Sequence, residues 1–454
     1  MRFRRVEYPV TTAGAVTEPA VTEPAAPSHP WWNRRGTWAT GWLIAALWAA
    51  AFPVISSLDT HRIWGTSAAL GYAAAAAVSY GVPGPRARRA GVTIALIGAV
   101  VVPLVLLVLT GRAQSEVDVI ERSGRLLLEQ GTPYLPHPHK VTDYTPYLPA
   151  MALLGIPKAL VGDHGWVARV LGDARIWCAA VFLLCLHRAR LTLRRSRPTV
   201  TPTGGGERMT YGTGVAALIA SPVVALPLCV SGVDLPLTGL CCLALAMAAV
   251  GRPAAAGLAL AVVCSLKWTA WPAIAVAVVL LGSVAGLRAA LRCAGTAVAG
   301  ATLLILPSAV ISPAAMVEQV LAFPTGRGDL PTPAASPLPG RLLADLGPAG
   351  WYAAVGLLLC GGLAVAVSLV RRPPAHLRAA ADRLAIGLMV AFTLAPAGRF
   401  GYLALPVVLV GWARLAAPRE RVRSLEVRGG RPARAAHLVP SRRPYAPAGT
   451  GAGR

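Results

Sequence analysis

Apolar runs of about 17 to 22 residues recur along most of this chain, and each is long enough to cross the hydrocarbon core of a bilayer as a helix. Backbone polar groups in that core must be hydrogen-bonded within the protein, so helices are the expected form. Charged residues make up only 14% of the 454 residues, against roughly 25% in soluble domains. The sequence therefore predicts an all-α, polytopic membrane protein and excludes a soluble enzyme.

The runs predict about 12 transmembrane helices with both termini on the same side. Eleven of them cover residues 39–57, 66–82, 90–110, 173–187, 211–230, 235–250, 269–287, 290–311, 349–370, 379–396 and 400–416, and a shorter span in a Pro-rich neighbourhood, 253–266, is added to them. Lys and Arg concentrate in cytoplasmic loops, so their positions test this count. One side then holds 31 Lys and Arg with 7 acids, and the other holds 12 of each, so the whole net charge of +24 falls on one face. The division predicts a plasma-membrane protein with cytoplasmic termini.

The strongly basic composition has no further function of its own. A net charge of +24 in a soluble chain would indicate nucleic acid, but here topology accounts for all of it. The membrane itself is the expected partner of the basic face, through anionic lipid headgroups. Arg outnumbers Lys 40 to 3, which is typical of a high-GC genome.

Composition also divides the chain into segments. Residues 1–38, with a tandem VTEPA repeat, and residues 417–454, rich in Arg, Gly and Pro, are expected to be disordered cytoplasmic tails. Residues 39–89 are expected to form a transmembrane hairpin, and residues 90–416 are expected to form a larger transmembrane domain. A glycine-rich linker at 188–210 is the candidate internal boundary.

The longest predicted outer loop, residues 111–172, is the main candidate for a functional site, because long loops in compact proteins tend to be functional. Glu116 and Asp118 follow directly on a crossing. Carboxylates so close to the membrane lose part of their hydration. This loss costs free energy unless a partner or a ligand compensates it. Either residue can equally be a solvated loop acid.

Two juxtamembrane helices are expected within this loop. Ile120, Leu127 and Leu128 have helical spacing and predict an amphipathic helix over residues 121–130. A second apolar stretch ends at Val161. We interpret it as interfacial or partly inserted, because a further crossing would invert the charge of every later loop.

Three motifs in this order resemble the GT-C superfamily, in particular glycosyltransferase family 87, the polyprenol-phosphate-mannose-dependent type common in actinobacteria. The first is EVDVIERSGRLLLEQGTPY followed by DYTPYLPAMALLGIP, the second is GLALAVVCSLKWTAWP, and the third is APAGRFGYLALP. Alignment on Gly124 and Tyr134 places Glu116 where the family usually has Asp. The resemblance covers roughly residues 90–416, and the crossings at 39–82 look like an addition.

The resemblance implies an inverting hexosyltransferase of GT-C fold that moves a sugar, with mannose expected, from a polyprenyl-phosphate donor to a lipid or polysaccharide acceptor on the outer face. No metal or other cofactor is required. Glu116 would be the catalytic base, with Asp118 as its competitor. Cations that would meet the donor phosphate are Lys267, Arg399 and, as a weaker third, Arg327. The expected acceptor or sugar contacts are Tyr134, His137, His139, Tyr144 and Asp234.

Several of these residues have an ordinary structural explanation. Lys267 would extend to the headgroups, and Asp234 would cap the next helix. The tyrosines would belong to an interfacial aromatic belt. His137 and His139 have no companion metal ligand except Asp143.

A transporter or flippase of lipid-linked saccharides is the alternative function. Transporters place their charges near the midplane on broken helices, often in repeat-related pairs. No internal repeat is recognisable here, and the acids gather in the first outer loop. A non-catalytic membrane assembly protein is a third possibility if the change from Asp to Glu marks lost activity.

Overall fold

The computed structural model describes residues 35–82, 85–196 and 210–417. Within these ranges every element is a helix, apart from one isolated parallel bridge between Ala335 and Gly398. The all-α prediction is confirmed. Helix α1 begins at Arg35, inside the predicted tail, and α8 continues to Arg195, inside the predicted linker. The rest of both tails and the glycine-rich part of the linker lie outside the described residues.

Helical segments occupy all the predicted apolar runs. They are α1 Arg35–Ile55, α2 Asp59–Gly81, α3 Pro85–Leu96 with η2 Ile97–Val101 and α4 Val102–Leu109, α8 Ala174–Arg195, α9 Tyr211–Ala220 with α10 Pro222–Val230, α11 Leu235–Ala249, α12 Pro253–Leu266, η5 Trp268–Ala270 with α13 Pro272–Ala285, α14 Leu287–Ile311, α17 Pro348–Arg371, α18 Leu377–Leu394, and η8 Phe400–Leu403 with α19 Ala404–Ala416.

Six of these segments are long and apolar enough to cross a membrane by themselves: Arg35–Ile55, Arg86–Leu109, Ala174–Arg195, Trp268–Ala285, Leu287–Ile311 and Pro348–Arg371. A seventh is possible if α9 and α10 form one span with a bend of 63°. The bend follows from Ser221, which precedes Pro222 and is extended there. The protein is therefore a helical membrane protein, and the count of 12 stays a prediction.

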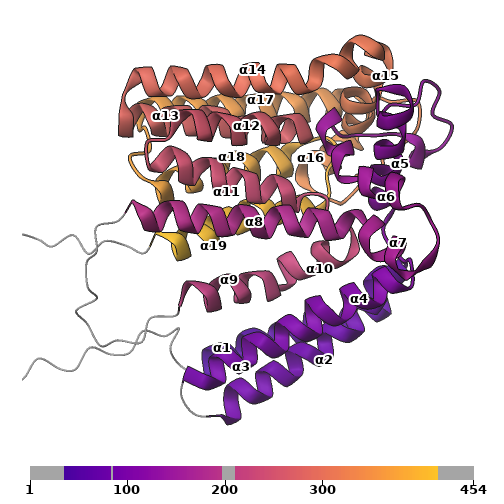
Figure 1. The fold of residues 1–454 in the computed structure, drawn as a ribbon, viewed down its shortest axis with the longest axis vertical. Coiled ribbons are helices and arrows are strands. Elements are labelled where there is room, and N and C mark those ends of the chain that lie inside the picture. Colours follow the sequence, from indigo (N-terminus) through magenta and orange to yellow (C-terminus); the bar gives the residue numbers. More distant parts are fainter. Residues whose placement is uncertain (1–34, 83–84, 197–209, 418–454) are drawn as a thin grey trace, which may run out of the picture. The chain divides into compact units, whose positions relative to one another are not determined.

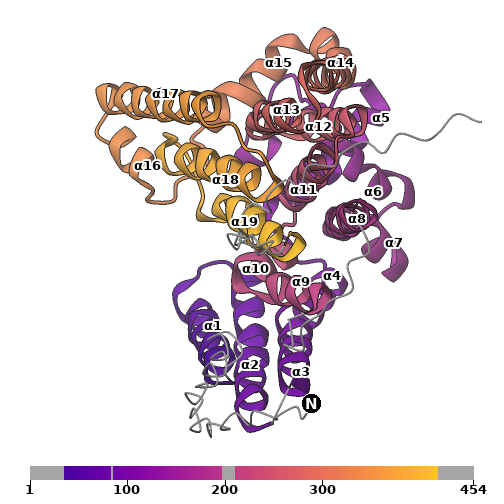
Figure 2. The same cartoon turned by 90° about the vertical axis from the view of Figure 1, so that its left-hand side faces the viewer.

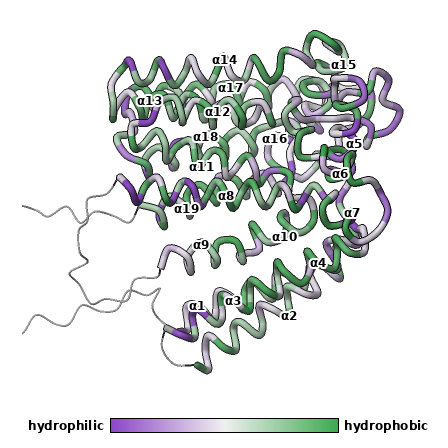
Figure 3. The backbone as a smooth tube through the Cα atoms, viewed as in Figure 1, coloured by the Kyte–Doolittle hydropathy of each residue, from purple (hydrophilic) through white to green (hydrophobic). Residues whose placement is uncertain are grey.

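The segments alternate in direction, so the outer-loop helices collect at one set of helix ends (Figure 1). Gln114 links two of those ends, because its side chain bonds His61 of α2 at 2.7 Å and its backbone N–H donates to Val230 of α10 at 3.0 Å. The N–H of Leu148 likewise donates to the carbonyl of Leu266 at the end of α12. Polar residues lie at both ends of the helices and apolar residues between them (Figure 3).

The predicted outer loops contain several short helices. They are α5 Ser115–Gln130, η3 Val141–Asp143, η4 Pro149–Leu154, α6 Ile156–Val161, α7 Gly165–Gly172, α15 Pro313–Val317, η6 Glu318–Ala322, η7 Phe323–Thr325 and α16 Pro339–Ala344. The apolar stretch before Val161 is thus a pair of short helices.

Helix α5 differs from its prediction in two ways. It begins at Ser115 instead of 121, so that Glu116 and Asp118 lie in its first turn, where the helix dipole favours acids. Its buried face centres on Ile120 and Gly124, and Leu128 is exposed. The cause is the close approach of Gly155: a Cβ at Gly124 would lie 2.3 Å from the carbonyl carbon of Gly155.

The helices of the predicted additional hairpin pack together and against the following segments (Figure 2). Trp64 and Tyr72 of α2 are fully buried. The Trp64 indole N–H donates to Ala99 at 2.8 Å, and the Tyr72 hydroxyl donates to Ala220 at 2.6 Å. These bonds join α2 to η2 and to the end of α9.

The predicted topology can be tested by labelling. In a Cys360→Ala background, which removes the exposed thiol, we expect His137→Cys to react with a membrane-impermeant maleimide on intact cells. Arg371→Cys, exposed at the end of α17, should react only after permeabilisation. The reverse pattern would invert the assigned orientation.

Candidate functional site

A cavity of about 1390 Å³ lies beside the outer-loop helices, and it is the main candidate site. Its lining residues come from α5, from the segment that contains Tyr144 and Tyr147, from α12 to α15, η6, η7 and residues 332–334, and from α17, α18 and the turn before α19. Only three of them are charged: Glu116, Lys267 and Arg399. The structure therefore brings together the predicted base and the two main predicted cations.

The remainder of the cavity is apolar and extends along α14 and α17. Val298 of α14 and Leu359 and Leu363 of α17 line it, and these side chains are 56%, 67% and 65% exposed. Exposed leucines on a membrane helix face lipid. The cavity therefore reaches an exposed apolar surface of α14 and α17.

Glu116 and Arg399 form an ion pair. Glu116 is held by the first turn of α5, and Arg399 lies in the turn between α18 and α19. That turn is fixed by the segment 334–336: Gly398 N–H donates to Ala334 at 2.9 Å, Ser336 N–H donates to Gly398 at 3.0 Å, and Phe400 N–H donates to the Ser336 hydroxyl at 3.2 Å. Three distant segments thus set the position of the pair.

Asp118 faces a different cavity. Residues two apart on a helix are about 200° apart around its axis, so α5 turns the two acids in nearly opposite directions. Asp118 lines a polar cavity of about 380 Å³ together with Glu121, Asp173 and Arg175. Burial raises the pKa of the Asp118 carboxyl. Only Glu116 reaches the large cavity.

Lys267 ends α12 and is only 8% exposed. Its ammonium donates to Asp234 at 2.8 Å and lies 4.3 Å from the ring centre of Tyr402 and 5.7 Å from that of Tyr147. It is therefore paired inside the protein and does not extend to the headgroups. Asp234 makes no side-chain hydrogen bond to the start of α11, so the helix-cap explanation has no support there.

Two of the other predicted residues, Arg327 and Tyr134, contact protein side chains or backbone and do not line the large cavity. Arg327 stacks on Trp351 at 4.6 Å and on Tyr352 at 5.8 Å, and it does not line the large cavity. Tyr134 is fully buried, and its hydroxyl donates to the carbonyl of Tyr147 at 2.9 Å. In this conformation Tyr134 has no surface that a sugar can reach.

The remaining candidates lie between residues 137 and 144. His137 and His139 are exposed, and the backbone N–H of His139 donates to Asp143 at 3.1 Å. Tyr144 lines the cavity, stacks on Phe323 at 4.2 Å, and donates its hydroxyl to Glu318 at 3.0 Å. Among the described residues, no group of three His, Cys, Asp or Glu side chains is placed to hold a metal ion.

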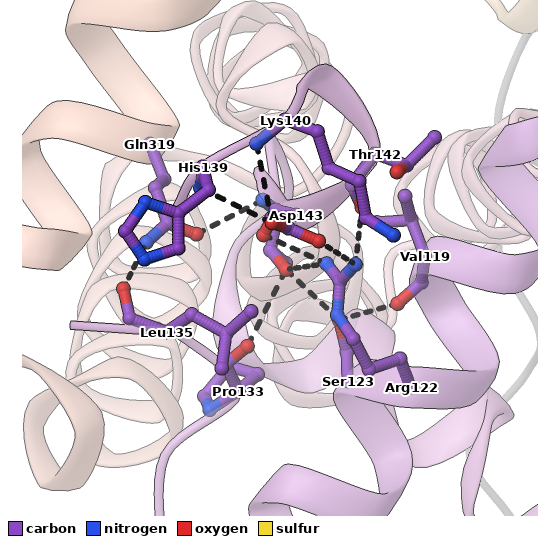
Figure 4. Close-up of polar contacts among 11 residues, drawn as sticks. Val119, Arg122, Ser123, Pro133, Leu135, His139, Lys140, Thr142, Asp143 and Gln319 are labelled. Atoms are coloured by element: carbon purple, nitrogen blue, oxygen red, sulfur yellow. Dashed lines mark hydrogen bonds and ion pairs between the residues drawn. The ribbon is translucent and has the colours of Figure 1, made fainter. Parts of the chain in front are cut away.

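The sequence did not indicate the residues that hold the outer loop in place. Arg122 donates to the carbonyls of Thr142 and Asp143 (Figure 4). Gln319, fully buried, accepts from the N–H of Thr145 at 3.0 Å and donates to Leu135 at 2.7 Å. A lone amide within an apolar run was the available signal for Gln319. Tyr402, three residues after Arg399, was the corresponding signal for an aromatic partner of Lys267.

No family model matches this chain, and no curated protein or solved structure matches it.

The second cavity gives a pH-dependent prediction. Burial is the main cause that raises the pKa of Glu121 to about 7. A carboxyl with a raised folded-state pKa destabilises the fold as pH rises from its ordinary value of 4.5 toward 7. Glu121→Gln should therefore be more stable than wild type at pH 8, by about 1 kcal/mol after allowance for water screening.

The two proteins should be nearly equal at pH 4.5, because both side chains are then uncharged. Thermal unfolding in detergent at both pH values measures the difference, and Glu129→Gln, exposed on the same helix, is the control. A difference that does not change with pH would contradict the prediction.

Proposed function

We propose that this protein is an integral membrane glycosyltransferase that moves a hexose, with mannose expected, from a polyprenyl phosphate to a hydroxyl of a glycolipid or polysaccharide. The observation that carries the proposal is the composition of one cavity: a single carboxylate, Glu116, and two cations, Lys267 and Arg399, at one end of a long apolar space.

The apolar part of the cavity matches the lipid part of such a donor. Because exposed residues of α14 and α17 line the cavity, a polyisoprenoid chain could enter between these helices from the bilayer without crossing water. The phosphate would then lie at Lys267 and Arg399, since charge-assisted bonds from Arg and Lys are the usual contacts for phosphate. A pocket that is mostly apolar with a few convergent polar groups is typical of a ligand site.

The transfer step is a single displacement. The acceptor oxygen attacks the anomeric carbon while its proton passes to the Glu116 carboxylate. The bond between the anomeric carbon and the phosphate oxygen breaks, and the phosphate leaves with the bonding electron pair. Lys267 and Arg399 stabilise the charge that develops on the leaving group. Attack opposite the leaving group inverts the anomeric configuration.

We further propose that all twelve helical runs cross the plasma membrane, with the cavity facing outside. Their alternating direction supports this topology. The shorter helices α12 and α19, of 14 and 13 residues, are only about 20 Å long. Helices of this length are shorter than the roughly 30 Å hydrocarbon core, so Lys267 and Arg399, which lie at their outer ends, would be below the outer membrane surface. The phosphate of a membrane lipid can reach that depth.

The base can be tested by two amide substitutions. Glu116→Gln should abolish transfer, because the amide cannot take the acceptor proton, while Asp118→Asn, which faces the other cavity, should keep most of it. Base catalysis contributes roughly 100- to 10,000-fold. The assay follows radiolabelled mannose from polyprenyl-phosphate-mannose into the lipid and polysaccharide fractions of membranes from a deletion strain.

The opposite ranking of the two variants would make Asp118 the base. Unchanged transfer in both variants would show that neither Glu116 nor Asp118 is the catalytic base. Movement of the donor across liposomes without sugar transfer would favour a flippase.

The cationic site can be tested at Lys267. Lys267→Met keeps the side-chain length but leaves the Asp234 carboxylate without a partner. An unpaired buried charge destabilises the fold, so a loss of activity in this variant could come from unfolding instead of from lost phosphate binding. The double variant Lys267→Met/Asp234→Asn removes both charges. We expect it to fold like wild type, by thermal unfolding, and to raise the KM for donor by about tenfold, the scale of one charged hydrogen bond. An unchanged KM would show that Lys267 does not bind phosphate.

A further inference from the structure

We propose that Glu116 and the donor phosphate compete for Arg399, so that the base becomes available only after the donor has bound. The inference rests on the proposed function and adds an order of events to it.

The ion pair is the observation behind this competition. Both partners line the cavity, and their side chains are only 14% exposed for Glu116 and 30% for Arg399. In the described part of the chain this is the one ion pair that either residue makes. The pair therefore neutralises the carboxylate and one of the two phosphate-binding cations at the same time.

A carboxylate in this pair is a weaker general base, because the positive charge of Arg399 already neutralises it. A general base must approach the acceptor hydroxyl to about 2.6 to 3.2 Å. While the guanidinium of Arg399 bonds the Glu116 oxygen, that oxygen faces Arg399 and not an acceptor. An acceptor that arrives before the donor thus meets a base that is already paired with Arg399.

The two cations differ in how they are held. Lys267 is enclosed by Asp234, Tyr402 and Tyr147, none of which is the proposed base. Arg399 has Glu116 as its partner. A phosphate can bond the planar guanidinium through two oxygens, which is a strong and directional contact. Lys267 is therefore the fixed half of the phosphate site, and Arg399 is the half that exchanges partners.

The exchange also fits the charge changes during transfer. Once the phosphate binds Arg399, Glu116 is a free anion, and it becomes neutral when it takes the acceptor proton. Arg399 then has only the leaving phosphate as an anionic partner. Loss of the proton from Glu116 to water restores its charge, re-forms the ion pair and favours release of the polyprenyl phosphate.

The test is a binding measurement that needs no sugar transfer. Full-length protein in nanodiscs is titrated with polyprenyl phosphate, and bound lipid is quantified. Glu116→Gln should bind about fivefold more tightly than wild type, on the scale of one partly exposed ion pair, because the competitor is gone. Arg399→Ala should bind at least tenfold more weakly.

The combined variant Glu116→Gln/Arg399→Ala should bind like Arg399→Ala alone, since without Arg399 there is nothing to compete for. Glu129→Gln makes the same chemical change at an exposed site on α5, and Arg341→Ala removes a cation from α16 that pairs with Asp345. Both controls should bind like wild type. If Glu116→Gln does not fold, Glu116→Ala replaces it with the same expected direction.

Unchanged or weaker binding by the Glu116 variant would overturn the competition. If Arg399→Ala still lost affinity in that case, the phosphate site of the proposed function would stand. If wild type itself failed to bind polyprenyl phosphate, the proposed function would fail together with the inference.

Discussion

The cost of burying a charge among apolar side chains is the constraint on which this structure depends. Such groups are expensive unless they are paired or enclosed in protein. Both charged pairs at the cavity meet this requirement, and both join segments that are far apart in the sequence: Glu116 with Arg399, and Asp234 with Lys267. The same bonds that neutralise the charges therefore fix the outer loop to the transmembrane helices and define the end of the cavity.

Helix α5 separates two environments because of its periodicity. One side presents Glu116 to a large, mostly apolar cavity, and the other presents Asp118 and Glu121 to a small polar one. The close packing of Gly124 on Gly155 fixes the rotation of the helix between them. A bulkier residue at either glycine would turn or displace α5, and both acids would move with it.

The sequence alone determined the all-helical fold, the positions of the helical runs and the three charged residues of the cavity. The helices could be predicted because an apolar run of membrane length has few alternatives to a helix. The cations could be predicted because a lone Lys or Arg beside such a run has a high free-energy cost, which points to a function. The start of α5 and its buried face were mispredicted, since hydropathy near the membrane surface does not distinguish packing on protein from contact with lipid. The same ambiguity leaves the number of crossings a prediction.

Only the tertiary structure decided the partners. Sequence spacing could not tell whether Asp234 capped a helix or paired with Lys267, because those residues are 33 apart and meet through the turn geometry of separate helices. It also could not show that Arg122 and Gln319 hold the outer loop, or that Tyr134 is buried. It also could not show that Glu116 and Asp118, two residues apart on α5, line different cavities. Composition and pattern determine which segments form apolar helices, whereas contacts between distant residues depend on how those segments pack.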